Sequence, residues 1–164
     1  MRQQTATASR TIAAPAAEIY QIIADYRTLH PLILPKPYFL SLDVEEGGYG
    51  AGTIVNFSMR ILGKTQSFRS LITEPEPGRM LLETDLNSGV ATRFSVQPLN
   101  RENRTQVSIG TELNNRSLIE GYVAKALLQR IYRQELELLA KLAEDHANLA
   151  PSVTSPQVGG LFHD

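Results

Sequence analysis

The side chains best placed to contact a small molecule are hydroxyls that alternate with apolar residues. Alternation along the expected strands puts Ser70, Thr84, Thr92 and Thr111 on the apolar side of their strands. Hydroxyl groups inside an apolar cleft fix the orientation of a ligand through hydrogen bonds. This pattern favours non-covalent binding over covalent catalysis.

The residues of the common nucleophilic and metal centres are missing or scattered. The chain has no cysteine, which excludes a disulfide scaffold, a thiolate nucleophile and a thiolate metal site. His30, His146 and His163 lie far apart and lack the paired spacing of a zinc site. Solvent-facing or capping histidines are the simpler interpretation, with His30 kept as a candidate because it abuts a proline-rich segment. We expect no metal and no cofactor.

Acid–base catalysis would require an ionisable side chain inside the apolar cleft. By strand alternation the candidates all fall on the polar side: Arg69, Glu83, Arg93 and Glu112. A β-bulge would reverse such an assignment. Tyr20 and Tyr122 offer hydroxyls from helices, where packing is the simpler role. No catalytic residue is therefore predicted.

A simple order of elements must position these side chains. A strand is expected over residues 5–13, followed by a short helix that starts near Pro15 and has an apolar stripe. Three prolines within residues 30–38 then forbid a regular helix or an inner strand and indicate an unusually apolar loop, a candidate lid. Six strands with hairpin-length turns follow, over 39–46, 53–62, 65–74, 79–86, 90–99 and 104–113.

One long amphipathic helix closes the domain. Ser117 and Glu120 form a capping-box pattern at its start, and apolar positions recur along one face as far as residue 142. The composition then shifts to Pro, Ser, Gly and Thr, which is typical of a flexible tail. The domain prediction is a single domain over 1–147 and a tail over 148–164.

The apolar face of the sheet is too wide for one helix to cover. A helix offers a stripe about 10 Å wide, whereas six or seven strands spaced about 4.8 Å apart span much more. With no tryptophan and 7% aromatic residues, side chains are expected to leave an apolar cavity. In strand 79–86 we assign Met80, Leu82, Thr84 and Leu86 to the apolar face. The predicted ligand-binding residues are Phe57, Met59, Phe68, Ser70, Leu82, Thr84, Thr92, Phe94, Ile109, Thr111, Tyr122 and Ala126.

Composition limits the partners. The net charge is −1, with sixteen basic and seventeen acidic residues, so the basic surface typical of a nucleic-acid-binding protein is not expected. Residues 1–10 lack the apolar core of a signal peptide, and no segment approaches the ~20 apolar residues of a membrane span. A cytoplasmic location is the expectation, and a homodimer stays open.

The chain resembles the START-like, or Bet v 1-like, superfamily (SRPBCC), which includes polyketide cyclase/dehydrase and lipid-transport proteins. Residues 10–25 resemble its opening strand and helix, 47–53 its glycine-rich turn, 72–79 a later turn, and the last helix matches in place and length. The resemblance implies an α+β helix-grip fold, in β-α-α-β6-α order, with about seven antiparallel strands gripping a long C-terminal helix.

Three functions are compatible with this sequence. The first is binding or transport of a hydrophobic small molecule, such as a lipid or polyketide-like compound. The second is a polyketide aromatase/cyclase or dehydratase, which the resemblance permits and which would need an ionisable group in the pocket. The third is a filled fold that serves as an interaction or dimer module through the outer sheet face or the Leu32 loop.

Overall fold

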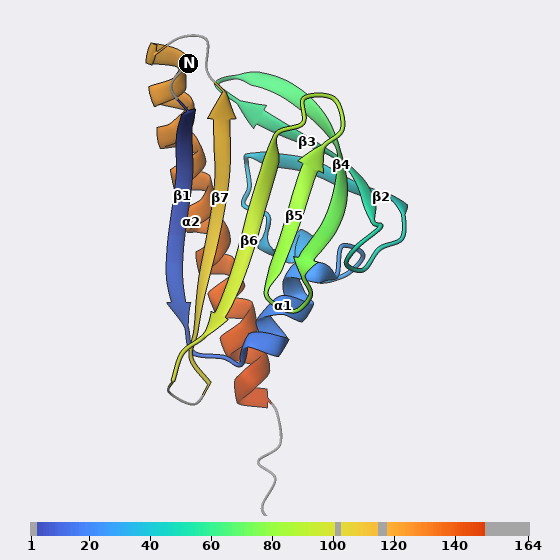
Figure 1. Cartoon of the computed structure of the whole chain (residues 1–164), viewed down its shortest axis with the longest axis vertical. Coiled ribbons are helices and arrows are strands. Elements are labelled where there is room, and N and C mark those ends of the chain that lie inside the picture. The colour runs from blue at the N-terminus through green and yellow to red at the C-terminus, as the bar shows by residue number, and fades with distance from the viewer. Residues whose placement is uncertain (1–2, 101–102, 115–117, 150–164) are drawn as a thin grey trace, which may run out of the picture.

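The expected order of elements is confirmed in the computed structural model, which describes residues 3–100, 103–114 and 118–149 (Figure 1). The predicted capping residue Ser117 and most of the predicted tail lie outside the described residues. The elements are β1 (Gln3–Ile12), α1 (Ala16–Ala24), the 3₁₀ helix η1 (His30–Ile33), β2 (Phe39–Glu46), β3 (Ile54–Ile61), β4 (Lys64–Glu76), β5 (Met80–Asp85), β6 (Ala91–Pro98), β7 (Thr105–Asn114) and α2 (Leu118–Leu149).

The strands form one antiparallel sheet in the order β1-β7-β6-β5-β4-β3-β2. Strands β2 to β7 are neighbours in sequence order because each pair is joined by a short turn, and β1 pairs with β7 at the far edge. The α+β helix-grip architecture is therefore confirmed. No helix in the described part of the chain combines the length and apolar character that crossing a bilayer requires.

The long helix covers the sheet mainly at its β1 edge. Helix α2 packs mainly on β1 and also contacts β7, α1 and η1, while β2, β3 and β4 bend round at the opposite side (Figure 1). Its middle and C-terminal turns bury Ile131, Leu136, Leu139 and Ala143 in the main core cluster. Space is left where α2 diverges from the bent strands.

The proline-rich segment is partly buried. Proline removes a backbone donor and restricts the chain, and residues 30–33 accordingly form only one 3₁₀ turn. Ile33 is completely buried, whereas Leu32 is 58% exposed. This segment therefore contributes to the core and also carries an exposed apolar residue.

Strand β5 has the opposite facing to the one predicted. Leu81 is completely buried and pairs with Phe94, and Glu83 pairs with Thr92. Residues paired across an antiparallel sheet share a face, so Leu81, Glu83 and Asp85 point inward and Leu82 and Thr84 outward. The apolar-face assignment of residues 80, 82, 84 and 86 is wrong, because the register of β5 with β4 and β6 places Leu81, Glu83 and Asp85 inward.

Candidate functional site: a cavity with buried carboxyl groups

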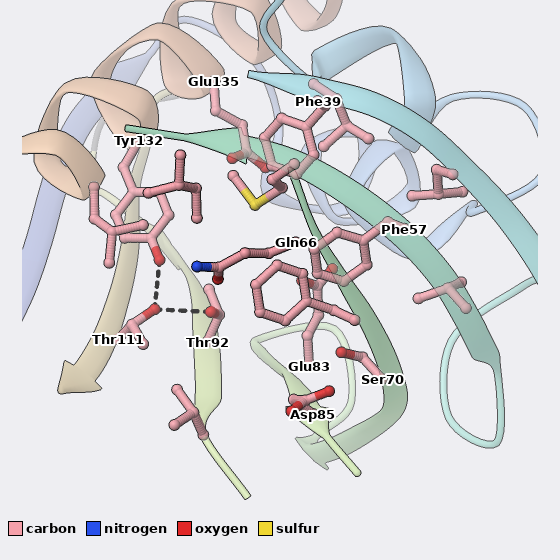
Figure 2. A pocket seen from close by; sticks show the side chains of 18 of the residues that line it. Phe39, Phe57, Gln66, Ser70, Glu83, Asp85, Thr92, Thr111, Tyr132 and Glu135 are labelled. Atoms are coloured by element: carbon pink, nitrogen blue, oxygen red, sulfur yellow. Dashed lines mark hydrogen bonds between the residues drawn. The ribbon is translucent and has the colours of Figure 1, made fainter. Parts of the chain in front are cut away.

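A cavity of about 440 Å³ lies between the inner face of the sheet and α2. Strands β3 to β6 supply the largest share of its lining, η1 and the following loop supply His30 and Leu34, and α2 supplies Leu127, Leu128 and other residues. The side chains project into it from these separate elements in Figure 2. Because the lining comes from both the bent sheet and the helix, the cavity exists only in the folded domain.

One wall of the cavity is aromatic. The rings of Phe57 and Phe68 stack with centroids 5.0 Å apart and planes 21° apart, and Phe39 lies 6.1 Å from Phe57. Phe57 and Phe68 are cross-strand partners on β3 and β4, which fixes their side chains on the same face. This wall presents aromatic surface suited to an apolar molecule that contains a ring.

A chain of hydroxyl groups forms part of the lining on β6, β7 and α2. The hydroxyls of Thr92 and Thr111 share a hydrogen bond of 2.7 Å, and Thr111 and Tyr132 share one of 2.5 Å (Figure 2). Burial raises the pKa of Tyr132 to about 12, so its hydroxyl keeps its proton at neutral pH. These groups can both donate to and accept from a polar group on a ligand.

Glu83 anchors a second polar cluster. The Tyr26 hydroxyl donates a 2.5 Å hydrogen bond to Glu83 Oε1, and His30 Nε2 lies 3.6 Å from the same oxygen. His30 Nδ1 donates to the carbonyl of Ile23 at 2.6 Å, and its ring stacks on Tyr26. Burial lowers the pKa of His30 despite the nearby carboxylate, so the imidazole is neutral at pH 7. His30 is buried, so the solvent-facing interpretation is wrong, whereas its bond to the Ile23 carbonyl in the last turn of α1 agrees with the capping one.

Glu135 is a buried carboxyl group with no partner of its own. It is 2% exposed, lines the cavity from α2, and makes no hydrogen bond or ion pair with the described residues. Burial, and secondly the charge of Glu83, raise the pKa of Glu135 well above that of an ordinary glutamate. Its carboxyl therefore tends to hold a proton when the cavity is empty.

Asp85, by contrast, accepts hydrogen bonds from β4 and from the turn after β5. Its carboxylate accepts hydrogen bonds from the backbone N–H of Arg69 and from the N–H and hydroxyl of Ser88. Burial alone would raise its pKa, but these hydrogen bonds lower the pKa of Asp85 below the usual value. Asp85 thus adds a negative charge to the rim of the site. In the described residues no three His, Asp or Glu side chains converge as metal ligands would.

The structure places the predicted binding residues unevenly. The cavity is lined by Phe57, Met59, Phe68, Ser70, Thr92, Phe94 and Thr111. Ile109 is completely buried beside Phe94 without lining it, Leu82 and Thr84 face the other side of the sheet, and Ala126 is exposed. The Tyr122 side chain lies outside the described residues.

The ionisable lining was missed. Arg69, Arg93 and Glu112 are exposed as expected, and Arg69 pairs with Glu45 outside the cavity. Glu83 and Glu135, however, face inward. Glu135 left a detectable signal, because it lies four residues from both Ile131 and Leu139 within the buried stripe of α2. An acid in that stripe indicates a polar cavity or a buried contact.

Residues 3–144 match the sequence model of the family described as polyketide cyclase/dehydrase and lipid transport. No curated protein matches the chain. Among solved structures, the KanY protein shows 26% identity and a TM-score of 0.77 over 88% of this chain and 99% of its own. The Zhui aromatase/cyclase from Streptomyces sp. R1128 shows 16% identity and a TM-score of 0.71, with 89% of this chain and 96% of that one covered.

A plant enzyme has the same fold. Norcoclaurine synthase from Thalictrum flavum, solved in complex with dopamine and hydroxybenzaldehyde, shows 15% identity and a TM-score of 0.68 over 88% of each chain. At this level of identity the likeness establishes the shared architecture alone.

Proposed function

The chain belongs to the polyketide cyclase/dehydrase and lipid-transport family, and we propose that it binds an apolar, ring-containing small molecule between the sheet and α2. The observation that carries this proposal is the cavity itself. Its volume of about 440 Å³ lies within the range of small-molecule sites, roughly 300–1,000 Å³. An aromatic wall and a set of hydroxyls supply the two kinds of contact that such a ligand needs.

The loop after η1 is proposed to form part of the entrance. Leu34 lines the cavity, while Leu32, two residues earlier, is exposed. At the other side the hairpin between β3 and β4 brings Leu62 and Gln66 to the lining, and both are largely exposed. A ligand entering between these segments would cover apolar surface that now faces solvent.

A larger side chain at Ser70 should block binding. Ser70 is 2% exposed and lines the cavity, so phenylalanine at this position would fill space that the ligand occupies. We expect Ser70→Phe to weaken binding of 1-naphthylmethanol at least about tenfold, equivalent to roughly 1.4 kcal/mol. Titration calorimetry would measure the affinity, and circular dichroism would check the fold.

Ser67→Phe is the matched control, because Ser67 lies on the same strand with its side chain exposed. It should bind the naphthalene probe as the wild type does. If Ser70→Phe does not fold, Gln66→Trp at the cavity lining replaces it in the comparison. Equal affinity in the wild type and a folded cavity variant would contradict the proposal.

A second candidate, acid–base chemistry on the bound molecule, is favoured by the two inward carboxyl groups. Glu83 accepts a hydrogen bond from Tyr26, whereas burial raises the pKa of Glu135, which has no partner within the described part of the chain. Two carboxyl groups in such different environments suit a base and an acid. Cyclisation or dehydration of a poly-β-keto chain, both of which begin with proton transfer beside a carbonyl, is the corresponding reaction.

Proton exchange in a simple ketone tests this candidate. With the wild type in ²H₂O, NMR should show exchange of the α-protons of α-tetralone about 10²-fold or more above the buffer rate, the usual range for general acid–base catalysis. The exchange should fall to the buffer rate in Glu83→Gln. If the wild type bound the ketone but the α-protons of the ketone exchanged at the buffer rate, the acid–base candidate would be contradicted and only the binding function would stand.

A further inference from the structure

We propose that the ligand carries a positively charged nitrogen, and that the cavity holds an organic ammonium group between Glu135, Glu83 and the aromatic wall. This inference rests on the proposed function and names the chemical class of its ligand: an amine attached to an apolar ring system.

The first support is the sign of the ionisable lining. Glu83, Asp85 and Glu135 face the cavity, together with His30, and the lining in the described residues includes no lysine or arginine. A cavity with one sign of charge and low-dielectric walls concentrates ligands of the opposite sign. A carboxylate ligand would meet no cation there, whereas an ammonium ion would meet acids.

The second support is the unpartnered carboxyl of Glu135. The carboxylates of Asp85 and Glu83 accept hydrogen bonds from the protein. The carboxyl of Glu135, which is only 2% exposed, makes no hydrogen bond with the described residues. The Glu135 carboxyl is removed from bulk water and gains from any hydrogen-bond partner that enters the cavity. A ligand N–H donor would supply the missing hydrogen bond, and a cationic one would form a charge-assisted bond.

The third support is the aromatic wall. Ring faces attract a cation within about 6 Å of the ring centroid, and Phe39, Phe57 and Phe68 present three neighbouring rings to the cavity. Figure 2 shows Glu135 entering from α2 and the labelled phenylalanines Phe39 and Phe57 beside the same space. The apolar part of the ligand and its charged nitrogen would thus both be accommodated.

Binding should release a proton. Because burial and Glu83 raise the pKa of Glu135, the empty cavity holds the protonated acid, and pairing with an ammonium ion requires that this proton leave to solvent. The affinity for an ammonium ligand should therefore rise with pH, by up to about tenfold per unit while Glu135 is protonated in the empty protein. The titratable groups that line the cavity with Glu135 are Glu83, Asp85, His30 and Tyr132. Tyr26, which precedes η1, is also close enough for the charge of Glu135 to act on it.

Three probes with one ring system test the inference at pH 7.5. Titration calorimetry would compare 1-naphthylmethylamine, a cation, with the neutral 1-naphthylmethanol and the anion 1-naphthoate. The cation should bind at least about tenfold tighter than the alcohol, which corresponds to roughly 1.4 kcal/mol, and the anion should bind most weakly. Titrations in buffers of different ionisation enthalpy should show net proton release with the amine and none with the alcohol.

Glu135→Gln keeps the shape of the side chain and removes its charge. This variant should lose the proton release, and its affinity for the amine should fall by a larger factor than its affinity for the alcohol, with Glu83 retaining part of the attraction. Glu137→Gln, an exposed acid on the same helix, is the matched control and should keep the preference. Equal affinity of the wild type for amine and alcohol, or an undiminished preference in Glu135→Gln, would overturn the inference.

These results separate this inference from the proposed function. If the alcohol binds and the amine binds no better, the cavity is a ligand site and the cationic class is wrong. If none of the three probes binds, the proposed function fails and the inference fails with it.

Discussion

Replacing Glu135 with glutamine should stabilise the empty protein at neutral and alkaline pH. A glutamate whose pKa is raised on folding does not lower the free energy of unfolding below its ordinary pKa of 4.5, because it is protonated in both the folded and the unfolded chain. Above pH 4.5 the unfolded chain gains by ionising while the folded chain must keep the proton, so wild-type stability falls. The advantage of Glu135→Gln should grow by about 1.4 kcal/mol per pH unit, up to the raised pKa.

Urea unfolding of both proteins between pH 4.5 and 8.5 would measure this difference. Glu137→Gln should follow the wild type at every pH, because Glu137 is exposed. Parallel curves of unfolding free energy against pH for the wild type and Glu135→Gln would contradict the prediction. They would mean that folding does not raise the pKa of Glu135.

Glu135 is expected to lower the stability of the empty protein and to strengthen binding of a cation. A buried acid that has no hydrogen-bond partner among the described residues lowers stability, so its presence is best explained by a contact that forms only with the ligand. Glu135→Gln is expected to make the fold more stable and to weaken binding of a cation, the trade-off often seen at functional sites. A purely structural role for Glu135 would instead predict a loss of stability.

Truncation of Phe94 should produce the other large effect. Phe94 is 2% exposed, packs edge-on against His30 with centroids 5.7 Å apart, and belongs to the core cluster while also lining the cavity. Phe94→Ala would remove these contacts and join new empty space to the existing cavity. We expect a loss of about 3–5 kcal/mol in the free energy of unfolding, measured by urea titration.

Phe57→Ala is the matched control for Phe94→Ala. Phe57 is only half-buried, since one side of its ring borders the cavity. Its truncation should therefore lower stability less than that of Phe94 while weakening binding of the naphthalene probes. Equal losses of stability in the two variants would mean that the cavity is packed as tightly as the core.

The architecture was predictable from the sequence because its local signals agree. Hairpin-length turns with Gly and Pro fix the strand order, and clean alternation in residues 55–59 and 92–96 identifies the inner face. The cavity is predictable because a sheet of six or seven strands is wider than one helix can cover. Long-range pairing was needed only to place β1 beside β7.

The acids of the site could not be assigned from local pattern. In residues 80–85 both faces contain an apolar residue, and the register with β4 and β6 selects the side carrying Leu81, Glu83 and Asp85. Glu83 is tolerated inside because Tyr26, more than fifty residues earlier, donates a hydrogen bond to it. Such a partner is visible only once the chain is folded.

A crystal structure with 1-naphthylmethylamine bound would test the central claim, that the space beneath α2 holds a guest molecule, most directly. The account predicts the naphthalene ring against Phe57 and Phe68, with its nitrogen within hydrogen-bonding distance of the Glu135 carboxyl. A structure in which the protein's own side chains fill this space and the amine lies elsewhere would contradict it.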